Sequence, residues 1–454
     1  MLKFGTDGVR GRFNETLRVQ DILQLGLAYG HMLVDQNKSS ARPRVVIGRD
    51  SRVSGDALQG AFAAGLMSGG VDVVDLGVLP TPAVAFAVRH ICAQGAAMLS
   101  ASHNPVADNG IKIFNADGKK LSDAQCRELE KLLNQSSELE LAQGVSVGRC
   151  SVDTTVRDLY RDFLLSNLEG ALDGLKIVLD CAHGAAAGHA EAVFEGAGAE
   201  VVMLCDVPDG EKINVACGST DLAQLSQAVI RHEAHLGFAF DGDADRCLAV
   251  CEKGRPVTGD QMMVVIATEL KKKSRLAHDR VVLTVMSNLG AEKSLQAQGI
   301  EVSRTPVGDR YVLEEMNRNG AVLGGEQSGH ILLMDRHWSG DGMLAGLVFA
   351  GIVASRGEAV SDMVGAIPEM PQKLVNVSGV DKDRLDSDEA VRQAIRRAEE
   401  RLGSDGRLLV RASGTEPLVR LMAEGPDEAL LNSVLDDLKA VVLERLGSQS
   451  AAHS

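Results

Sequence analysis

The stretch Leu236-Gly-Phe-Ala-Phe-Asp-Gly-Asp-Ala-Asp-Arg246 places a short apolar run directly before three alternating aspartates. Such a run is typical of a buried strand, and the carboxylates after it belong to a loop. In open parallel sheets, ligands bind beyond the carboxyl ends of the strands. The stretch therefore predicts an α/β fold whose chemistry lies in the loops that follow its strands.

The same order of elements occurs three times along the chain. In each copy, helical patterns alternate with short apolar runs, which favours βαβ units around a parallel sheet. The last strand of each copy is predicted at residues 96–100, 236–240 and 321–323, and the loops after them begin at Ser100, Asp241 and Gly324. These three loops are also the most unusual segments of their copies, so we expect each copy to supply one functional loop.

Beyond residue 368 the pattern changes to a smaller α+β domain. It has predicted strands at 373–377, 408–411 and 418–423, helices at 388–402 and 427–446, and a disordered tail from 447. The predicted fold is three similar mixed or parallel-sheet α/β domains plus this smaller domain, around a central cleft. The predicted boundaries are 1–150, 151–254, 255–368 and 369–454.

Composition and charge limit the possible partners. Hydrophobic residues make up 45% and charged residues 24% of the 454 residues, as in ordinary globular proteins. The net charge of −15 repels a phosphate backbone, and with 3% aromatic residues base stacking is improbable. We therefore expect no nucleic-acid partner.

Nothing in the sequence predicts a membrane or a disulfide framework. The first ten residues lack the apolar stretch of a signal peptide, and the longest nearly apolar segment, 342–355, is too short to cross a bilayer as a helix. The eight cysteines form no Cys-x-x-Cys pair. We expect free thiols, a cytoplasmic location and no membrane partner.

The first loop is Ser100-Ala-Ser-His-Asn-Pro105, continued by Asp108-Asn-Gly-Ile-Lys112. A serine beside His103 suggests a nucleophile. However, adjacent residues on an extended loop usually point apart, and the Gly-x-Ser-x-Gly motif is absent. Simple turn chemistry is the alternative. Lys112 could neutralise a phosphate or transfer a proton.

The second loop, Asp241-Gly-Asp-Ala-Asp-Arg246, predicts a magnesium site. Three carboxylates at alternate positions repel one another unless a cation lies among them, and Arg246 could bind a phosphate. An EF-hand has similar aspartate spacing, but Arg246 stands where that loop needs glycine, and a strand precedes the loop instead of a helix. A solvated acidic turn is the other alternative.

Two further loops have the composition of a sugar phosphate site. In Gly324-Gly-Glu-Gln-Ser-Gly-His330, Glu326 and Ser328 alternate and can bind two hydroxyls of a polyol, and His330 could act as an acid or a base near neutral pH. In Arg411-Ala-Ser-Gly-Thr-Glu-Pro417, guanidinium, hydroxyl and backbone N–H groups can bind a phosphate. A satisfied turn histidine and an ordinary hairpin are the alternatives.

Together, these four motifs resemble the alpha-D-phosphohexomutase superfamily in order and relative spacing, over essentially the whole chain. The segment Phe4-Gly-Thr-Asp-Gly-Val-Arg-Gly11, Gln327 and Cys217-Gly-Ser-Thr220 resemble the bacterial amino-sugar branch, whose members interconvert glucosamine 6-phosphate and glucosamine 1-phosphate. Hexose-type relatives commonly have Met at the position of Gln327. The resemblance implies an isomerase that supplies UDP-N-acetylglucosamine and cell-wall precursor synthesis.

The resemblance also implies a role for each residue. Ser102 would carry the transferred phosphate and would bind Mg²⁺ together with Asp241, Asp243 and Asp245. It would place Arg10, His103, Lys112, Arg246 and His330 around the reacting phosphate. It would place Gly325, Glu326 and Ser328 at the sugar, and Arg411, Ser413, Gly414, Thr415 and Arg420 at the second phosphate.

By resemblance, Ser102 donates its phosphate to the sugar, giving glucosamine 1,6-bisphosphate, which turns around and returns its other phosphate. The implied partners are small sugar phosphates, and the protein would be a monomer or homodimer. The alternatives are a phosphomannomutase or phosphoglucomutase, a phosphatase with an aspartate nucleophile, and a non-catalytic sugar-phosphate-binding protein.

Overall fold

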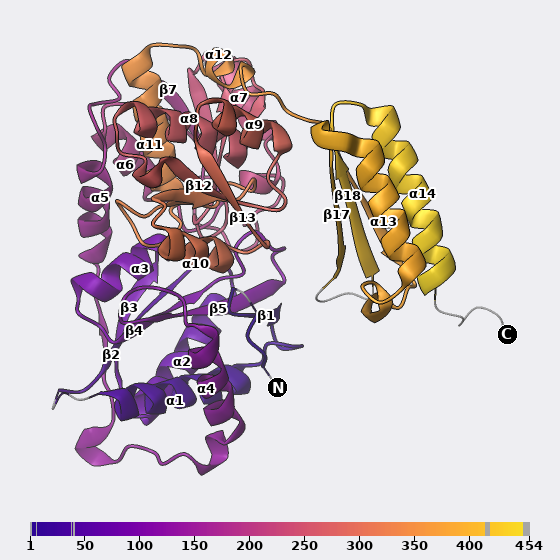
Figure 1. The fold of residues 1–454 in the computed structure, drawn as a ribbon. Coiled ribbons are helices and arrows are strands. Elements are labelled where there is room, and N and C mark those ends of the chain that lie inside the picture. Colours follow the sequence, from indigo (N-terminus) through magenta and orange to yellow (C-terminus); the bar gives the residue numbers. More distant parts are fainter. Residues whose placement is uncertain (1, 6, 38, 40, 414–417, 448–454) are drawn as a thin grey trace. The chain divides into compact units, whose positions relative to one another are not determined.

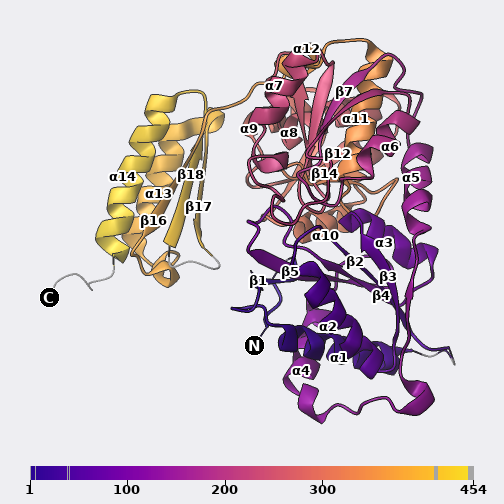
Figure 2. The same cartoon turned by 180° about the vertical axis from the view of Figure 1, so that it is seen from behind.

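The structure is a computed structural model that describes residues 2–5, 7–37, 39, 41–413 and 418–447. The chain folds into two compact units. The first unit contains residues 1–284 and 301–366, and the second contains 285–300 and 367–454. Figures 1 and 2 show the ribbon from two opposite sides.

The N-terminal part of the first unit is a mixed sheet with helices packed on it. Its strands follow the order β1-β5-β4-β2-β3-β6. They span Val9–Arg12 (β1), Arg44–Arg49 (β2), Asp72–Val78 (β3), Gly95–Leu99 (β4), Asp108–Asn115 (β5) and Cys150–Val152 (β6), and the helices are Val19–Gln36 (α1), Gly55–Ser68 (α2), Thr81–His90 (α3) and Asp123–Asn134 (α4).

The middle part of the chain forms a second sheet in the order β11-β10-β9-β7-β8. Its strands are Lys176–Asp180 (β7), Glu200–Leu204 (β8), Leu236–Phe240 (β9), Cys247–Cys251 (β10) and Pro256–Val257 (β11), and its helices are Val156–Ser166 (α5), Ala190–Gly196 (α6) and Ala223–Arg231 (α7).

A third sheet follows in the order β13-β12-β14-β15. It is built from Arg280–Thr284 (β12), Glu301–Thr305 (β13), Leu323–Gly325 (β14) and Ile331–Leu333 (β15), with helices Gly259–Lys272 (α8), Asp309–Asn319 (α10), Gly342–Arg356 (α11) and Val360–Gly365 (α12). The apolar segment 342–355 forms α11, which is mostly buried and is capped by Asp341. None of the described helices is long and apolar enough to cross a membrane.

The three sheets share one topology, which confirms the predicted repeat. In each, a central strand pairs in parallel with the next strand and with a third strand, and the third strand then pairs with its successor in an antiparallel hairpin. The hairpins are β4–β5, β9–β10 and β14–β15. Because the functional loops connect the strands of these hairpins, each repeat presents its loop at the same topological position.

The second unit is a smaller α+β domain with an antiparallel sheet, as predicted. Its sheet order is β16-β18-β17. The elements are Leu289–Ala297 (α9), Gln372–Ser378 (β16), Glu389–Leu402 (α13), Arg407–Ala412 (β17), Leu418–Glu424 (β18) and Glu428–Leu446 (α14).

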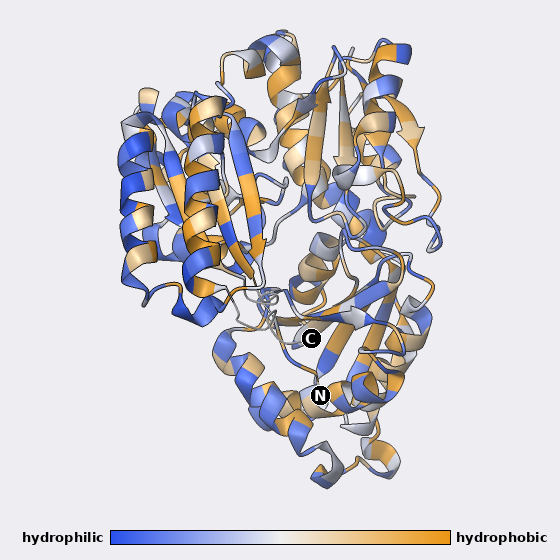
Figure 3. Ribbon diagram, turned by 90° about the vertical axis from the view of Figure 1, so that its right-hand side faces the viewer, coloured by the Kyte–Doolittle hydropathy of each residue, from blue (hydrophilic) through white to orange (hydrophobic). Residues whose placement is uncertain are grey.

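Helix α13 buries one face, with Val391, Ala394, Ala398 and Leu402 at helical spacing. Figure 3 shows hydrophilic and hydrophobic residues alternating along the helices of this unit. The sequence pattern places α9 in the third repeat, but in the folded chain it belongs to the second unit, where Leu289 N donates to Glu424 Oε1 at 2.7 Å.

One expectation about the first loop is wrong. Residues 108–112, which we expected to continue the loop, begin β5, so that Lys112 lies on a strand opposite Met98 of β4. The strand alternation places Lys112 inside the first unit, where it is fully buried. The predicted disordered tail lies outside the described residues, except for Gly447.

Candidate active site

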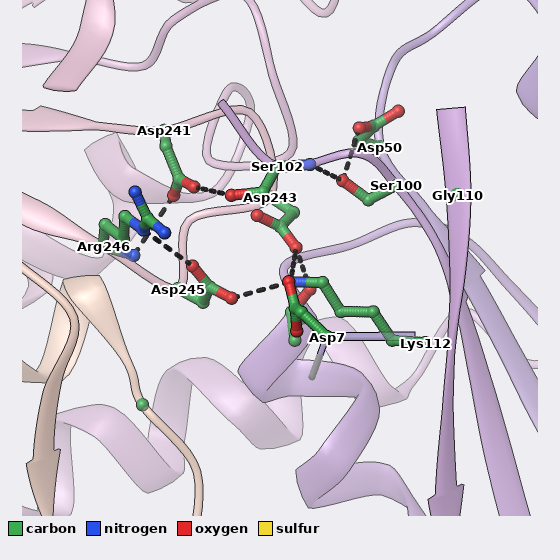
Figure 4. Close-up of polar contacts among 12 residues, drawn as sticks. Asp7, Asp50, Ser100, Ser102, Gly110, Lys112, Asp241, Asp243, Asp245 and Arg246 are labelled. Carbon is green, nitrogen blue, oxygen red and sulfur yellow. Dashed lines mark hydrogen bonds and ion pairs between the residues drawn. The ribbon is translucent and has the colours of Figure 1, made fainter. Parts of the chain in front are cut away.

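The hairpin loops after β4 and β9 meet at Ser102. Its hydroxyl is buried and donates a hydrogen bond of 2.6 Å to Asp241 Oδ2. Figure 4 shows Ser102 between the acidic loop and a second carboxylate, Asp50. Ser102 N donates to Ser100 Oγ at 2.8 Å, and Ser100 Oγ donates to Asp50 Oδ2 at 2.7 Å. The structure thus brings Ser102 and the acidic loop, which the sequence analysis assigned to one site, into direct contact.

The loop conformation also brings Ser102 and His103 together, contrary to our expectation that adjacent side chains point apart. Ser102 Oγ lies 3.3 Å from His103 Nδ1. The cause is the backbone of Ser102, which has a φ of +53° instead of an extended conformation. Burial, followed by the charges of Arg246 and Arg10, lowers the pKa of His103 to about 4. The imidazole is therefore neutral near pH 7.

The acidic loop fits a divalent cation. Asp241, Asp243 and Asp245 are buried, and each contributes a carboxylate oxygen within 4.8 Å of the others. Burial, followed by the charges of Asp245 and Asp243, raises the pKa of Asp241 well above its usual value. Oδ1 of Asp243 is buried and accepts no hydrogen bond from the described part of the chain. Carboxylate oxygens are the ligands that Mg²⁺ prefers, so this donor set suits Mg²⁺.

Lys112 lies in the same cluster. Its Nζ donates to Asp243 Oδ2 at 2.7 Å and to Asp245 Oδ2 at 2.8 Å, and lies 3.4 Å from Asp7 Oδ2. Burial by itself would lower the pKa of Lys112, but Asp243 and Asp245 raise it well above its usual value. Lys112 thus adds a positive charge among the carboxylates of the acidic loop, as Figure 4 shows.

Two arginines add positive charge around the serine. Arg10 Nη1 donates to Asn104 Oδ1 at 3.0 Å, which joins β1 to the Ser102 loop. Arg246 N donates to Asp241 Oδ1 at 3.1 Å, and its Nε lies 4.0 Å from Asp245 Oδ1. With Lys112, these side chains provide a local basic lining in a chain whose net charge is −15.

The loop between β14 and β15 joins the same cluster through His330. Its Nδ1 lies 3.5 Å from Asp245 Oδ1, and its Nε2 lies 3.6 Å from Asp309 Oδ2. Burial opposes protonation, but Asp245 raises the pKa of His330 above its usual value. Glu326 and Ser328 lie side by side, with Ser328 Oγ 3.5 Å from Glu326 Oε2. The structure therefore brings the three predicted loops of the first unit together.

The fourth predicted loop lies in the second unit. Arg411 of β17 pairs directly with Arg420 of β18. Burial, followed by the charge of Arg420, lowers the pKa of Arg411. Two guanidinium groups on neighbouring strands favour an anion between them. Ser413 lies at the start of the loop, whereas Gly414 and Thr415 lie outside the described residues.

Sequence reasoning missed several charged residues around these loops, including Asp50 and Asp309. Asp7 contacts Lys112 and also forms ion pairs with Arg10 and Lys120. Lys382 Nζ donates to Ser413 O at 2.6 Å beside the fourth loop. Arg52 donates hydrogen bonds to two carbonyls of the Ser102 loop. Asp7 lies within the quoted segment Phe4–Gly11, which could have revealed it, but no motif indicates Arg52 or Lys382.

Comparison with protein families finds three α/β/α domains followed by a C-terminal domain, the order described above for the sheets. Four models described as phosphoglucomutase/phosphomannomutase match the chain: alpha/beta/alpha domain I over residues 1–140, domain II over 158–254, domain III over 258–370, and the C-terminal domain over 374–441.

Curated relatives match nearly the whole chain. A phosphoglucosamine mutase of Carboxydothermus hydrogenoformans is 46% identical over 440 residues, which cover 97% of this chain and 98% of that protein. A phosphoglucosamine mutase of Paenarthrobacter aurescens is 48% identical over 448 residues, which cover 98% of each.

Solved structures share the fold. A phosphoglucomutase/phosphomannomutase family protein of Burkholderia thailandensis has a TM-score of 0.82 at 25% identity, with 97% of each chain covered. An N-acetylphosphoglucosamine mutase of Aspergillus fumigatus, solved with GlcNAc-6P and magnesium, has a TM-score of 0.67 at 16% identity, with 98% of this chain and 96% of that chain covered. This second similarity concerns the fold alone.

Proposed function

We propose that this chain, which belongs to the phosphoglucomutase/phosphomannomutase family, is an isomerase that interconverts glucosamine 6-phosphate and glucosamine 1-phosphate. The observation that carries the proposal is the hydrogen bond of 2.6 Å between Ser102 Oγ and Asp241, inside a cluster suited to Mg²⁺. The choice of an amino sugar rests on relatives that are 46–48% identical over nearly the whole chain.

In the proposed reaction, Ser102 carries a phosphate and exchanges it with the sugar. A sugar hydroxyl oxygen bonds to phosphorus as the bond between phosphorus and Ser102 Oγ breaks, and the hydroxyl proton ends on Ser102. The product is glucosamine 1,6-bisphosphate. After this bisphosphate turns around, the phosphorus of its other phosphate bonds to Ser102 Oγ as the bond between that phosphorus and the sugar oxygen breaks, and the proton passes from Ser102 to that sugar oxygen. The two steps together move the phosphate between O1 and O6 and regenerate the phosphoserine.

The residues of the cluster would neutralise the phosphate charge in two ways, through a bound metal ion and through basic side chains. Asp241, Asp243 and Asp245, with the phosphoserine, would hold Mg²⁺, which neutralises phosphate charge when bound. Lys112 and Arg246 would bind the phosphate oxygens that carry the remaining charge. Such fixed charges favour phosphoryl transfer because the transition state spreads negative charge over the phosphate oxygens.

The remaining predicted residues would complete the site. Arg10 and His103 would border the reacting phosphate, and His330 and Lys112 are the candidates for proton transfer. Gly325, Glu326 and Ser328 would bind the sugar hydroxyls, and Arg411, Ser413, Gly414, Thr415 and Arg420 would hold the phosphate that is not reacting.

The role of Ser102 is tested by mass spectrometry of its peptide together with an assay on glucosamine 6-phosphate. We expect the purified protein to carry phosphate on this peptide after treatment with a sugar bisphosphate. Ser102→Ala should lose both the phosphate and the isomerisation, whereas Ser166→Ala, an exposed control on α5, should keep both. Full isomerisation by Ser102→Ala would reject the phosphoserine mechanism. Phosphate found on Asp241 or Asp243 would instead favour a phosphatase-like mechanism.

The substrate is tested by comparing the turnover of the 6-phosphates of glucosamine, mannose and glucose. We expect kcat/KM to be highest for glucosamine 6-phosphate. Equal or better use of mannose 6-phosphate would favour the phosphomannomutase alternative. Binding without isomerisation of any of the three, with Mg²⁺ and sugar bisphosphate present, would favour a sugar-phosphate-binding protein.

We also propose a cytoplasmic enzyme, monomeric or dimeric, whose product enters the synthesis of UDP-N-acetylglucosamine and cell-wall precursors. The domain boundaries at 150, 254 and 368 belong to the same proposal. Limited proteolysis followed by mass spectrometry tests them, since exposed boundaries are cleaved first.

A further inference from the structure

Arg52 is a buried arginine next to the Ser102 loop. It follows β2, and its side chain has no exposed surface. Charged side chains are almost never fully buried unless they are paired. Here the pair is Asp50, whose Oδ2 accepts a hydrogen bond of 3.0 Å from Arg52 Nε.

The guanidinium group of Arg52 uses all five of its N–H donors. Besides the bond to Asp50, Nη1 donates to the carbonyls of Pro105 at 2.6 Å and Asp108 at 2.8 Å. Nη2 donates to the carbonyls of Ser102 at 2.9 Å and Asn104 at 2.8 Å. An arginine has five such donors in a rigid plane. Arg52 therefore has no donor left for a phosphate, although it lies close to the reacting serine.

These bonds hold Ser102 from both sides. Its carbonyl accepts from Arg52, and its N–H donates to Ser100 Oγ, which is bound to the same Asp50 carboxylate. The φ of +53° at Ser102 is unfavourable for a residue with a side chain and persists only where the surroundings enforce it. The pair formed by Arg52 and Asp50 supplies this restraint.

We propose that Arg52 is a positioning residue of the Ser102 loop. By binding four carbonyls between Ser102 and Asp108, it fixes the backbone so that Ser102 Oγ stays at the acidic cluster. The effect on turnover rests on the proposed function, whereas the restraint on the loop does not. Arg52 acts through the backbone of Ser102 and touches none of the phosphate-binding side chains named above.

The test compares Arg52→Lys with Arg42→Lys. Lysine keeps the charge but has three donors, so it cannot bind the four carbonyls and Asp50 together. Arg42 is a matched control in the same part of the chain, where it binds Asp72 Oδ1 at 2.9 Å and Val145 O at 2.6 Å. We expect Arg52→Lys to lower kcat at least ~100-fold, since a displacement of 1 Å can cost that much. KM should change less than about threefold because Arg52 binds no substrate. Arg42→Lys should match the wild type in both constants.

Amide hydrogen exchange separates loop restraint from general unfolding. In Arg52→Lys, the peptide covering residues 100–110 should exchange faster, whereas peptides of the other repeats should be unchanged. Faster exchange along the whole chain would show that Arg52 supports the fold in general, and would reject the proposal. Unchanged exchange in the 100–110 peptide would reject it as well.

A double variant controls for the buried charge. Arg52→Met alone leaves Asp50 buried without its partner, which is destabilising. Asp50→Asn with Arg52→Met removes both charges, and we expect its melting temperature to lie closer to the wild-type value than that of Arg52→Met. If kcat stays low in this double variant, the hydrogen bonds from Arg52 to the loop carbonyls are what turnover requires. If kcat returns to within about threefold of the wild-type value, the proposal is overturned. If the wild type isomerises no sugar phosphate, the proposed function fails, and hydrogen exchange still decides whether Arg52 restrains the loop.

Discussion

Replacing Gly242 by alanine should separate the Ser102 loop from the acidic loop 241–246. Gly242 lies between Asp241 and Asp243, and a Cβ there would lie 2.7 Å from the carbonyl oxygen of Ser102. It would also lie 2.9 Å from Ile213 Cδ1 and 3.0 Å from Asn214 Nδ2. Ordinary contact begins near 3.4 Å, so the loops must move apart by about 0.7 Å.

The Ser102 carbonyl cannot easily move to relieve this contact. It accepts hydrogen bonds of 2.9 Å from both Arg52 Nη2 and Asn214 Nδ2. A shift of this size would stretch the Ser102–Asp241 bond beyond normal hydrogen-bond length. We expect kcat to fall ~10- to 100-fold, because a displacement of about 1 Å can cost ~100-fold. Overpacking should also lower the free energy of unfolding by about 1–3 kcal/mol.

The assay measures kcat on glucosamine 6-phosphate together with thermal unfolding. Gly60→Ala is the control, since Gly60 lies within α2 and a Cβ there meets nothing within 4 Å. This control should keep wild-type kcat and gain up to about 1 kcal/mol from helix propensity. A Gly242→Ala protein with wild-type kcat and wild-type stability would refute the reasoning.

Three further predictions concern the metal, pH and a helix cap. Chelation of divalent cations should abolish turnover, and Asp243→Asn should raise the Mg²⁺ concentration for half-maximal rate at least ~10-fold; an unchanged Mg²⁺ titration would contradict the assigned cluster. Burial, followed by the charge of Arg89, lowers the pKa of His337 from 6.5 to about 3, so the unfolded chain binds a proton that the folded protein does not, and stability falls as pH drops through this window. Between pH 6.5 and about 5, the free energy of unfolding in urea should fall less for His337→Phe than for the wild type, by on the order of 2 kcal/mol. Equal decreases in the two proteins would show that His337 does not cause the pH dependence. Asp341→Ala removes the cap of α11 and the acceptor of the buried Tyr160 hydroxyl at 2.8 Å. We expect the free energy of unfolding in denaturant to fall by about 2–4 kcal/mol. A similar decrease in Asp341→Asn would argue against the lost acceptor as the cause.

Local patterns predicted the repeat well because the three copies share strand order and hairpin position. The run 236–240 is β9, and Asp241 begins the loop, as expected. The segment 108–112 was harder to predict, because Asp, Asn and Gly are typical of turns. Its strand conformation comes from pairing with β1 and β4, partners that are distant in the sequence.

Sequence-local reasoning also failed for the pair Ser102 and His103. The expectation that neighbours point apart assumes an extended backbone. Ser102 has a left-handed conformation, and its carbonyl accepts hydrogen bonds from Arg52 and Asn214, which lie 50 and 112 residues away and reach it only in the folded chain.

The class of fold, the four loops and the chemistry predicted for each loop follow from residue type and strand periodicity, which are local properties. Which groups meet depends on the folding of the whole chain. Folding places Lys112 between Asp243 and Asp245, brings His330 to Asp245, and brings Arg52 to the Ser102 carbonyl. These contacts join residues far apart in the chain, and burial sets their charge states, since the cost of an isolated charge away from water must be offset by a partner that only folding brings near.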